Sequence, residues 1–386
     1  MNIDLNGIST PCYICDESVL EQNLRVLSFV QEKSGCKIML ALKGFAMFSM
    51  FPLIRKYLKG TAVSSLDEAR LGFEEFGGEV HVYAPAYKDG EFESLLSYAD
   101  HICFNSFSQW RRFKSPISRY KKKKIECGIR INPQHSEVRI PIYDPCCRHS
   151  RLGVTAELFQ EEDLNGISGL LFHNLCGLNA DALDRTLKVV EERFGRYIER
   201  MQWVNFGGGH RMTSDDYDID KLCELIISFK ERYQVDVYLE PGEAVVLNSG
   251  VLVASVLDII HNEMDIAILD TSAAAHMPDV IEMPYKPKIV GAVSTNNEQP
   301  ATSNQHIYKL TGMTCLAGDV IGDYSFPQPL QVGTKLIFLD MAHYTMVKNH
   351  TFNGIRLPSI AIYNSNTGQV RIVREFRYED YKNRLS

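Results

Sequence analysis

The sequence lacks the features that would point to a membrane or a nucleic acid. No stretch comes near the roughly 20 consecutive apolar residues that a bilayer-spanning helix needs. The N-terminus, MNIDLNGISTPCYIC, has no basic segment followed by a long apolar one, so we expect no signal peptide. Acidic residues outnumber basic ones: the 386-residue chain has a formal net charge of −7, and its one strong basic block is Lys121 to Lys124. We therefore expect neither a nucleic-acid nor a membrane partner.

The ten cysteines lack the regular spacing of a disulfide framework or a zinc site. Cys12 and Cys15 form one C-x-x-C, but no second pair with zinc-like spacing follows, and the surrounding PCYICDE is typical of a short strand. We therefore expect reduced thiols in a cytoplasmic protein, and no bound metal.

What the chain does contain is a long alternation of strand and helix patterns, enough for a (β/α)₈ barrel over residues 30–250. The clearest helix pattern is Ala182 to Met201, where apolar residues recur at three- and four-residue steps. The candidate strands are KIMLALK (37–43), TAVSS (61–65), EVHVYA (79–84), HICFNS (101–106), IECGIRIN (125–132), GISGLLFHN (166–174), WVNFGGG (203–209) and VDVYLEPG (235–242).

After Val245 the pattern changes to short strands separated by Gly, Pro and Asn, without convincing helices. The clearest of these strands are GVLVASVLDII, MDIAILD, IYKLTG, TKLIFLD and RIVREF. We expect a second, all-β domain over residues 251–386, shaped as a β-sandwich or barrel. Residues 1–29 are too short to fold alone and join either domain.

Lys43 lies in the middle of a nearly all-apolar stretch, KIMLALKGFAMFSMF, residues 37 to 51. Burying a charged amine is costly and core packing has no use for one, so we expect Lys43 to be buried for a chemical reason. It ends the first barrel strand, and barrel enzymes carry their active sites at such ends. A lysine with a lowered pKa can form a Schiff base with an aldehyde there.

Three further features end strands of the same barrel and would meet Lys43 at one mouth. His173 ends the sixth strand, the triplet Gly207 to Gly209 follows the seventh, and Glu240 ends the eighth. Glycines expose the backbone N–H groups that phosphate oxygens require, so the predicted aldehyde is pyridoxal phosphate, with Glu240 on the pyridine nitrogen and His173 against the ring. Taken singly, each feature also fits a tight turn, a core histidine or a capping carboxylate.

Several motifs resemble those of the carboxynorspermidine/carboxyspermidine decarboxylases, which belong to the alanine-racemase-like, fold-type III pyridoxal-phosphate enzymes. The motifs are ALKG, FHNLC, NFGGGH, EPGEA, HMPDVIEMPY, TGMTCLAGDVIGDY and HYTMVKNHTFNGI, and the resemblance runs from TPCYICDE to REFRYEDY. It implies a decarboxylase of polyamine biosynthesis that converts carboxynorspermidine or carboxyspermidine to norspermidine or spermidine.

The resemblance also implies roles for individual residues. Lys43 would be the Schiff-base lysine, His173 the ring-stacking histidine and Glu240 the partner of the pyridine nitrogen. Gly207, Gly208 and Gly209 would hold the phosphate, with Tyr344 nearby.

Further residues come from the same comparison. Relatives form head-to-tail homodimers with active sites at the interface, so Cys315 of TGMTC would arrive from the second subunit, where it is associated with protonating the carbanion. A polyamine arm carries cationic amines that call for carboxylates, which Glu243 and Asp279 would supply, with Asp319 a weaker candidate. Gly177 stands where the family usually has a glutamate, and Cys147 where a small residue is usual.

Three other functions are weighed at this point, and the intact Lys43, glycine triplet and Glu240 count against one of them, a catalytically inactive polyamine-binding protein. An amino-acid racemase on the same fold would need a second base, for which Tyr344 is a candidate. A non-catalytic pyridoxal-phosphate carrier tends to be a barrel alone, so the β domain counts against it.

Overall fold

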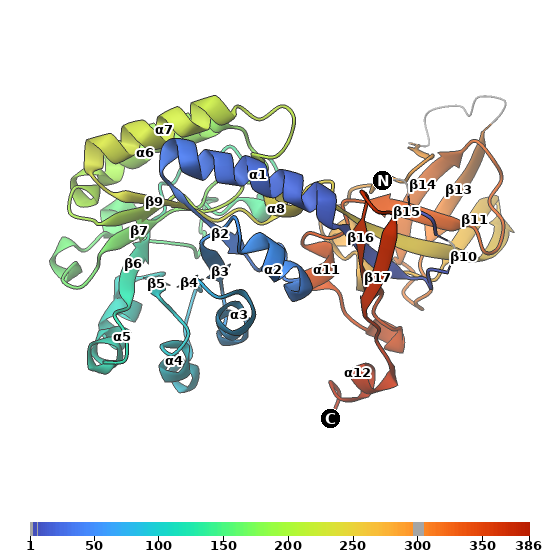
Figure 1. Ribbon diagram of the computed structural model, residues 1–386, viewed down its shortest axis with the longest axis horizontal. Helices are drawn as coiled ribbons and strands as arrows, with labels where there is room; N and C mark the ends of the chain where they lie inside the picture. The colour runs from blue at the N-terminus through green and yellow to red at the C-terminus, as the bar shows by residue number, and fades with distance from the viewer. Residues whose placement is uncertain (1–2, 6, 296–304) are drawn as a thin grey trace. The chain divides into compact units, whose positions relative to one another are not determined.

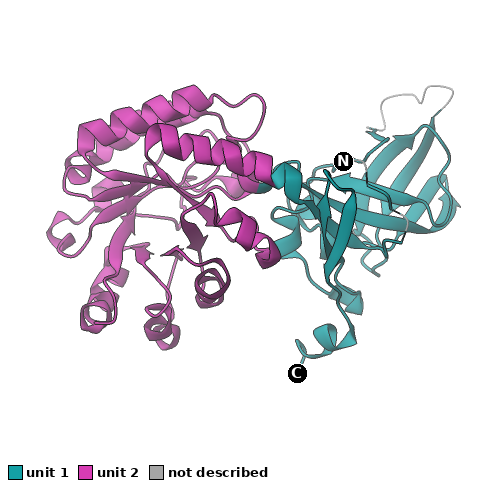
Figure 2. Ribbon diagram, in the orientation of Figure 1, with its two compact units in different colours: residues 1–20, 246–386 teal, residues 21–245 magenta. Residues whose placement is uncertain are grey.

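The computed structural model describes residues 3–5, 7–295 and 305–386. The chain divides into two compact units: residues 21–245 form one, and residues 1–20 together with 246–386 form the other (Figure 2). None of the helices in the described part of the chain combines the length and apolar character that a membrane span requires.

The unit of residues 21–245 contains a closed barrel of eight parallel strands in sequence order (Figure 1). All eight strands expected from the sequence are present, which confirms the (β/α)₈ prediction. They are β2 (Lys37–Ala41), β3 (Gly60–Val63), β4 (Glu79–Tyr83), β5 (His101–Phe104), β6 (Glu126–Arg130), β7 (Gly169–Leu171), β8 (Trp203–Asn205) and β9 (Asp236–Leu239).

Packing inside the barrel depends on pairing one large side chain with two glycines. The indole of Trp203 fills the space beside Gly169 and Gly128 on the two preceding strands. A Cβ added at Gly169 would lie 2.0 Å from the Trp203 ring, and one at Gly128 2.5 Å from it. The small residues on β6 and β7 therefore make room for the large one on β8.

Helices alternate with most of the barrel strands, and α6 and α7 lie side by side (Figure 1). The helix predicted at 182–201 is α6, which begins earlier and ends before Met201. Between β6 and β7 the chain forms only single 3₁₀ turns. The helices are α1 (Glu17–Ser34), α2 (Phe51–Ile54), α3 (Leu66–Leu71), α4 (Asp89–Leu95), α5 (Phe107–Arg119), α6 (Ala180–Ile198), α7 (Ile219–Tyr233) and α8 (Glu243–Val246).

The other unit is built on a mixed sheet in which the 13-residue strand β10 pairs with three neighbours. Its first half pairs with β1 and β15, and its second half with β11 across a register shift. The strands are β1 (Cys12–Asp16), β10 (Gly250–Asn262), β11 (Met264–Leu269), β12 (Val293–Ser294), β13 (His306–Thr311), β14 (Val320–Phe326), β15 (Lys335–Leu339), β16 (Ser359–Asn364) and β17 (Gln369–Arg374).

Three of these strands, β12, β14 and β16, were not predicted. A glycine and polar residues interrupt the apolar pattern of VIGDYSF in β14, although Ile321, Tyr324 and Phe326 pack into the buried cluster of this sheet. The sequence also missed the short helices α9 (Ala273–His276), α10 (Asp279–Glu282), α11 (Thr345–Lys348) and α12 (Tyr378–Lys382), which are too brief to show a helical period.

Replacing Gly169 with alanine tests the packing around Trp203. We expect Gly169→Ala to lower the free energy of unfolding by about 3 kcal/mol or more, because the new methyl group would overlap the indole. Gly90→Ala is the control, because this exposed helical glycine has no atom within 4 Å of the added Cβ. It should leave the free energy of unfolding unchanged or raise it by up to about 1 kcal/mol. Urea denaturation measures both. Equal stability of the two variants would contradict the packing argument.

Candidate active site

The C-terminal ends of the barrel strands converge on one pocket. Four of the residues predicted from the sequence line it together: Lys43, His173, Gly208 and Glu240. Their chain positions span almost 200 residues, so it is the closure of the barrel that collects them.

Lys43 is held at this mouth by a close approach of two backbone segments. β2 ends at Ala41, whose N–H donates to the carbonyl of Pro241 at 3.0 Å. A Cβ at Gly44 would lie 2.8 Å from the Cα of Gly242. The turn that carries Lys43 therefore packs directly on the turn after Glu240, and both glycines are required by this contact.

The side chain of Lys43 projects into the open pocket and is exposed as a residue, so the expectation of a fully buried amine is wrong for the free protein. The pocket walls nevertheless surround the amine. This desolvation, followed by the positive charge of Arg130, lowers the pKa of Lys43 below that of an ordinary lysine. A lowered pKa favours the neutral amine that reacts with an aldehyde.

Glu240 is oriented by a residue that the sequence did not suggest. The buried Asn205, at the end of β8, donates through Nδ2 to Glu240 Oε1 at 2.7 Å, and its Oδ1 accepts from the N–H of Gly207 at 2.8 Å. Asn205 thus joins the carboxylate to the glycine triplet. Its only signal in the sequence is a polar residue within the apolar segment WVNF.

The glycine triplet forms a tight cradle, with φ of 72° at Gly207 and 84° at Gly209. A Cβ at Gly208 would lie 2.3 Å from the carbonyl oxygen of Glu240. The sequence predicted three N–H groups open to an anion, but two of them already donate within the protein. Gly207 donates to Asn205 Oδ1 and Gly208 to His173 Nδ1. Within the described part of the chain the N–H of Gly209 donates no hydrogen bond, so it is the one left for a phosphate.

His173 is a neutral imidazole whose Nδ1 faces the backbone of Gly208. Its Nδ1 lies 2.9 Å from the nitrogen and 3.1 Å from the carbonyl oxygen of Gly208, so either tautomer has a partner there. Burial, followed by the positive charges of Lys43 and Arg130, holds the pKa of His173 well below its usual range. Arg130, buried over the ring of Tyr83 and donating to the carbonyl of His173 at 3.2 Å, is a second pocket residue that the sequence did not suggest.

Glu243, the carboxylate predicted to meet the substrate's amines, already has a cation beside it. Arg211 Nε lies 3.3 Å from Glu243 Oε1. A Cβ at Gly177 would lie 3.4 Å from Arg211 Cδ, so Arg211 packs over the glycine that replaces the family's glutamate. A substrate amine would compete with Arg211 for Glu243.

The remaining candidates lie in the other unit, within residues 246–386. Cys315 is exposed, and its N–H donates to Asn353 Oδ1 at 2.8 Å. Asp319 is buried, and its carboxylate accepts from Ser272 Oγ at 2.9 Å and Thr314 Oγ1 at 2.6 Å. The role of Asp319 in substrate binding stays a prediction. Its hydrogen bonds indicate a structural role, which is to hold the turn that carries Cys315.

Two predicted residues of this unit frame the short helices. Asp279 begins α10 and forms an ion pair with Lys348 of α11. Tyr344 precedes α11 with φ of 48°, a conformation that costs energy in a residue other than glycine. Their contacts with cofactor or substrate stay predictions.

Fold and site together define a barrel enzyme whose mouth offers an amine of lowered pKa, a glycine cradle and an oriented carboxylate. Residues 12–342 match the family described as "Pyridoxal-dependent decarboxylase, C-terminal sheet domain". The chain therefore belongs to the pyridoxal-dependent decarboxylases.

Similar proteins match the chain over nearly its whole length, and they confirm the resemblance found in the sequence. The carboxynorspermidine/carboxyspermidine decarboxylase of Campylobacter jejuni is 48% identical over 97% of this chain and 98% of its own. The carboxyaminopropylagmatine decarboxylase of Synechocystis sp. is 45% identical over 100% of this chain and 97% of its own. The crystal structure of the Campylobacter jejuni carboxynorspermidine decarboxylase with norspermidine superposes with a TM-score of 0.90, at 47% identity, over 98% of this chain and 100% of that one.

Competitive acylation tests the lowered pKa of Lys43, because lysines react with acylating reagents only as neutral amines. We expect Lys43 to become reactive at a lower pH than the exposed Lys122 in the same sample, as measured by peptide mass spectrometry across a pH series. Arg130→Met removes a positive charge that lowers the pKa of Lys43. The pKa should therefore rise, and Lys43 should become reactive only at higher pH. The exposed Arg148→Met serves as the control. Reactivity of Lys43 at or above the pH of Lys122 would contradict the assignment.

Proposed function

We propose that this protein is a pyridoxal-phosphate-dependent decarboxylase that converts carboxynorspermidine or carboxyspermidine to norspermidine or spermidine. The observation that carries the proposal is the convergence of Lys43, His173 and Glu240 on one pocket in a chain of this family. Full-length relatives with that activity support the substrate class.

The pocket fits the cofactor in three respects. Lys43 offers an amine of lowered pKa to the aldehyde, Gly209 offers a backbone N–H to the phosphate, and the cradle has no room for a side chain at Gly208. Glu240, fixed by Asn205, would accept a hydrogen bond from the pyridine nitrogen and keep it protonated. When bound, pyridoxal phosphate supplies an electron sink for the electrons left as carbon dioxide departs.

The chain's own residues would handle the remaining chemistry. Neutral His173 would lie against the ring without adding a positive charge to it. Decarboxylation replaces a carboxylate with a hydrogen atom, so one proton must reach the α-carbon, and we assign its delivery to Cys315 of a second subunit in a homodimer. The exposure of Cys315 supports a role outside its own unit's core.

We also propose that the enzyme works in the cytoplasm. All ten cysteines are free thiols in this structure. Such thiols are typical of a reducing compartment.

A second candidate substrate is carboxyaminopropylagmatine, whose decarboxylase in Synechocystis sp. is 45% identical to this chain. Its arm ends in a guanidinium instead of an amine. Both substrates present a cation that a carboxylate such as Glu243 would bind, so the pocket's charge alone favours neither.

The direct test is carbon dioxide release from the cofactor-loaded protein with carboxynorspermidine, carboxyspermidine, carboxyaminopropylagmatine, ornithine and diaminopimelate side by side. We expect release from the first two and little or none from the last two. Glu243→Gln should raise KM for the polyamine substrates about tenfold with little change in kcat, because it removes a charge that binds the arm.

The exposed Glu224→Gln, on α7, is the matched control and should behave as wild type. Release from the agmatine derivative alone would move the assignment to that substrate. Loss of optical rotation of an amino acid without carbon dioxide would instead indicate a racemase. An unchanged KM in Glu243→Gln would remove Glu243 from the binding site.

A further inference from the structure

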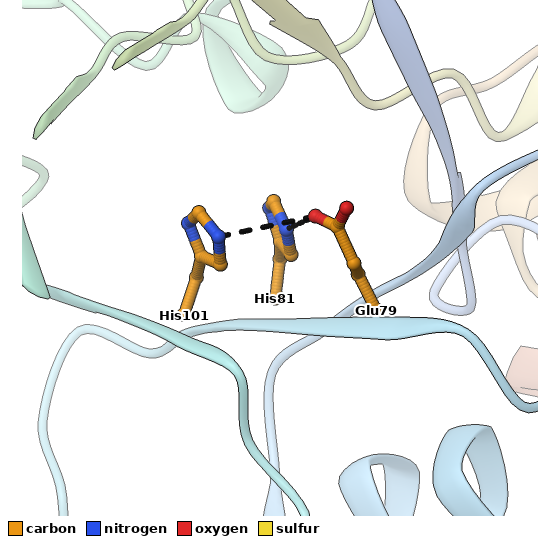
Figure 3. Close-up of side chains that lie close together, drawn as sticks. All are labelled: Glu79, His81 and His101. Carbon is orange, nitrogen blue, oxygen red and sulfur yellow. Dashed lines mark hydrogen bonds and ion pairs between the residues drawn. The ribbon is translucent and has the colours of Figure 1, made fainter. Parts of the chain in front are cut away.

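A cluster of polar side chains lies inside the barrel and reaches the pocket through His81. The Nε2 of His81, on β4, lies 3.0 Å from Glu79 Oε2, and the ring of His101, on β5, stacks on it at 3.8 Å between centroids (Figure 3). Their ligand atoms lie within 4.8 Å of one another, as in a metal site. Imidazole lone pairs lie in the ring plane, however, so two rings inclined by only 16° cannot direct theirs at one ion. Lys37 Nζ, 3.7 Å from Glu79 Oε1, also opposes a cation, and we assign no metal to the cluster.

The loop between β6 and β7 holds a different reactive group, the adjacent thiols of Cys146 and Cys147. They are the only neighbouring cysteines among the ten of the chain. Cys147 is exposed, whereas Cys146 is partly buried. Two thiols on consecutive residues can react with each other through a change confined to one turn of the chain, and the proposed decarboxylation uses neither of them.

The turn that carries the two thiols is anchored on both sides. The N–H of Cys146 donates to Asp144 Oδ1 at 2.9 Å. Ser150 closes the turn, because its N–H donates to the carbonyl of Cys147 at 2.9 Å and its Oγ donates to the carbonyl of Pro145 at 2.6 Å. These bonds use the main chain of the cysteines, and so they hold the turn without engaging the sulfur atoms.

This turn is connected to the pocket in two ways. Burial raises the pKa of Cys146 to about 11, and the positive charge of Arg130, a pocket residue, opposes part of that rise. At the base of the turn, Asn105 donates through Nδ2 to the carbonyl of Arg151 at 2.8 Å and accepts through Oδ1 from the hydroxyl of Tyr83 at 2.8 Å. Tyr83 lines the pocket and has the Arg130 guanidinium 4.6 Å from its ring centroid. A rearrangement of the turn therefore acts on residues of the pocket wall.

We propose that Cys146 and Cys147 form a reversible redox switch that a hydroperoxide closes into a disulfide. With hydrogen peroxide, the sulfur of the exposed Cys147 attacks one peroxide oxygen, giving a sulfenic acid and one molecule of water. The thiol of Cys146 then attacks that sulfur, so the S–S bond forms and a second water leaves. The two thiols together give up two hydrogen atoms and two electrons, and one hydrogen peroxide is reduced to two molecules of water.

The resulting bond should be easy to reduce again. The Cα atoms of consecutive residues are about 3.8 Å apart, closer than the roughly 4.4–6.8 Å of ordinary disulfides, so a ring of this size is strained. Strained and exposed disulfides are the labile ones. Closing the ring draws the sulfur of Cys146 toward Cys147 and away from Arg130, so oxidation alters the pocket wall and reduction restores it.

Peptide mass spectrometry on the intact, peroxide-treated protein tests the switch. Trypsin cleaves after Arg139 and Arg148, so residues 140–148 form one peptide that contains both thiols and no other cysteine. We expect this peptide to lose two hydrogen atoms and to resist alkylation, and dithiothreitol should reverse both changes. In Cys147→Ser, Cys146 should stay open to alkylation after peroxide treatment.

The control is the exposed Cys176 in the tryptic peptide 152–185, because this thiol has no cysteine beside it. Its peptide should not lose two hydrogen atoms under the same treatment. A sulfinic or sulfonic acid on Cys147 with Cys146 still open to alkylation would overturn the inference. A disulfide that joins either thiol to Cys176 or Cys315 would also overturn it.

The effect on the pocket rests on the proposed function and is measured separately, as the affinity for pyridoxal phosphate after the peroxide has been removed. We expect oxidation to weaken binding about fivefold in the wild type, with recovery in dithiothreitol, and to leave Cys147→Ser unchanged. Effects of the other thiols would appear in both proteins. A disulfide without any change in affinity would overturn the link to the pocket. Failure of the untreated protein to bind the cofactor would contradict the proposed function, while the peptide result would still decide whether the switch exists.

Discussion

The backbone contact between Gly44 and Gly242 is the constraint on which the site depends. It presses the turn after β2 against the turn after β9, where the barrel closes, and so brings Lys43 and Glu240 to the same pocket from opposite ends of the barrel sequence. Any side chain at Gly44 would meet backbone, which cannot move aside without opening the barrel. The backbones that carry the amine and the carboxylate are therefore positioned by the fold, and Asn205 then orients the carboxylate.

Around this contact the pocket is built from side chains that orient one another. Asn205 joins Glu240 to the glycine triplet, the backbone of Gly208 holds Nδ1 of His173, and Glu79 holds Nε2 of His81. Each bond removes a choice of rotamer or protonation before a ligand arrives, which is how a site reduces the cost of organising itself during binding. The positive charge of Arg130 then favours neutral forms of Lys43 and His173.

The sequence was most informative where a periodic pattern or a strand end carried the information. The eight barrel strands, Lys43, His173 and Glu240 could all be predicted because residues at the ends of parallel strands share one mouth. Asn205, Arg130 and His81 could not, because a polar residue inside an apolar strand gives no sign of the side chain it will meet across the barrel. The exposure of Lys43 was missed because an apolar stretch predicts burial, whereas the pocket opens beside it. The ion pair between Glu243 and Arg211 could not be predicted, because it joins segments that follow two different barrel strands, and no periodic sequence pattern indicates how such segments fold.

The central claim is that Lys43 is the residue that binds the cofactor covalently, and one measurement tests it directly. The protein is loaded with pyridoxal phosphate, reduced with borohydride to make the attachment permanent, digested and analysed by peptide mass spectrometry. The account predicts the cofactor's added mass on the peptide containing Lys43, and its absence from that peptide in Lys43→Ala. Attachment to a different lysine, or a Lys43→Ala protein that still becomes labelled to the same extent, would contradict it.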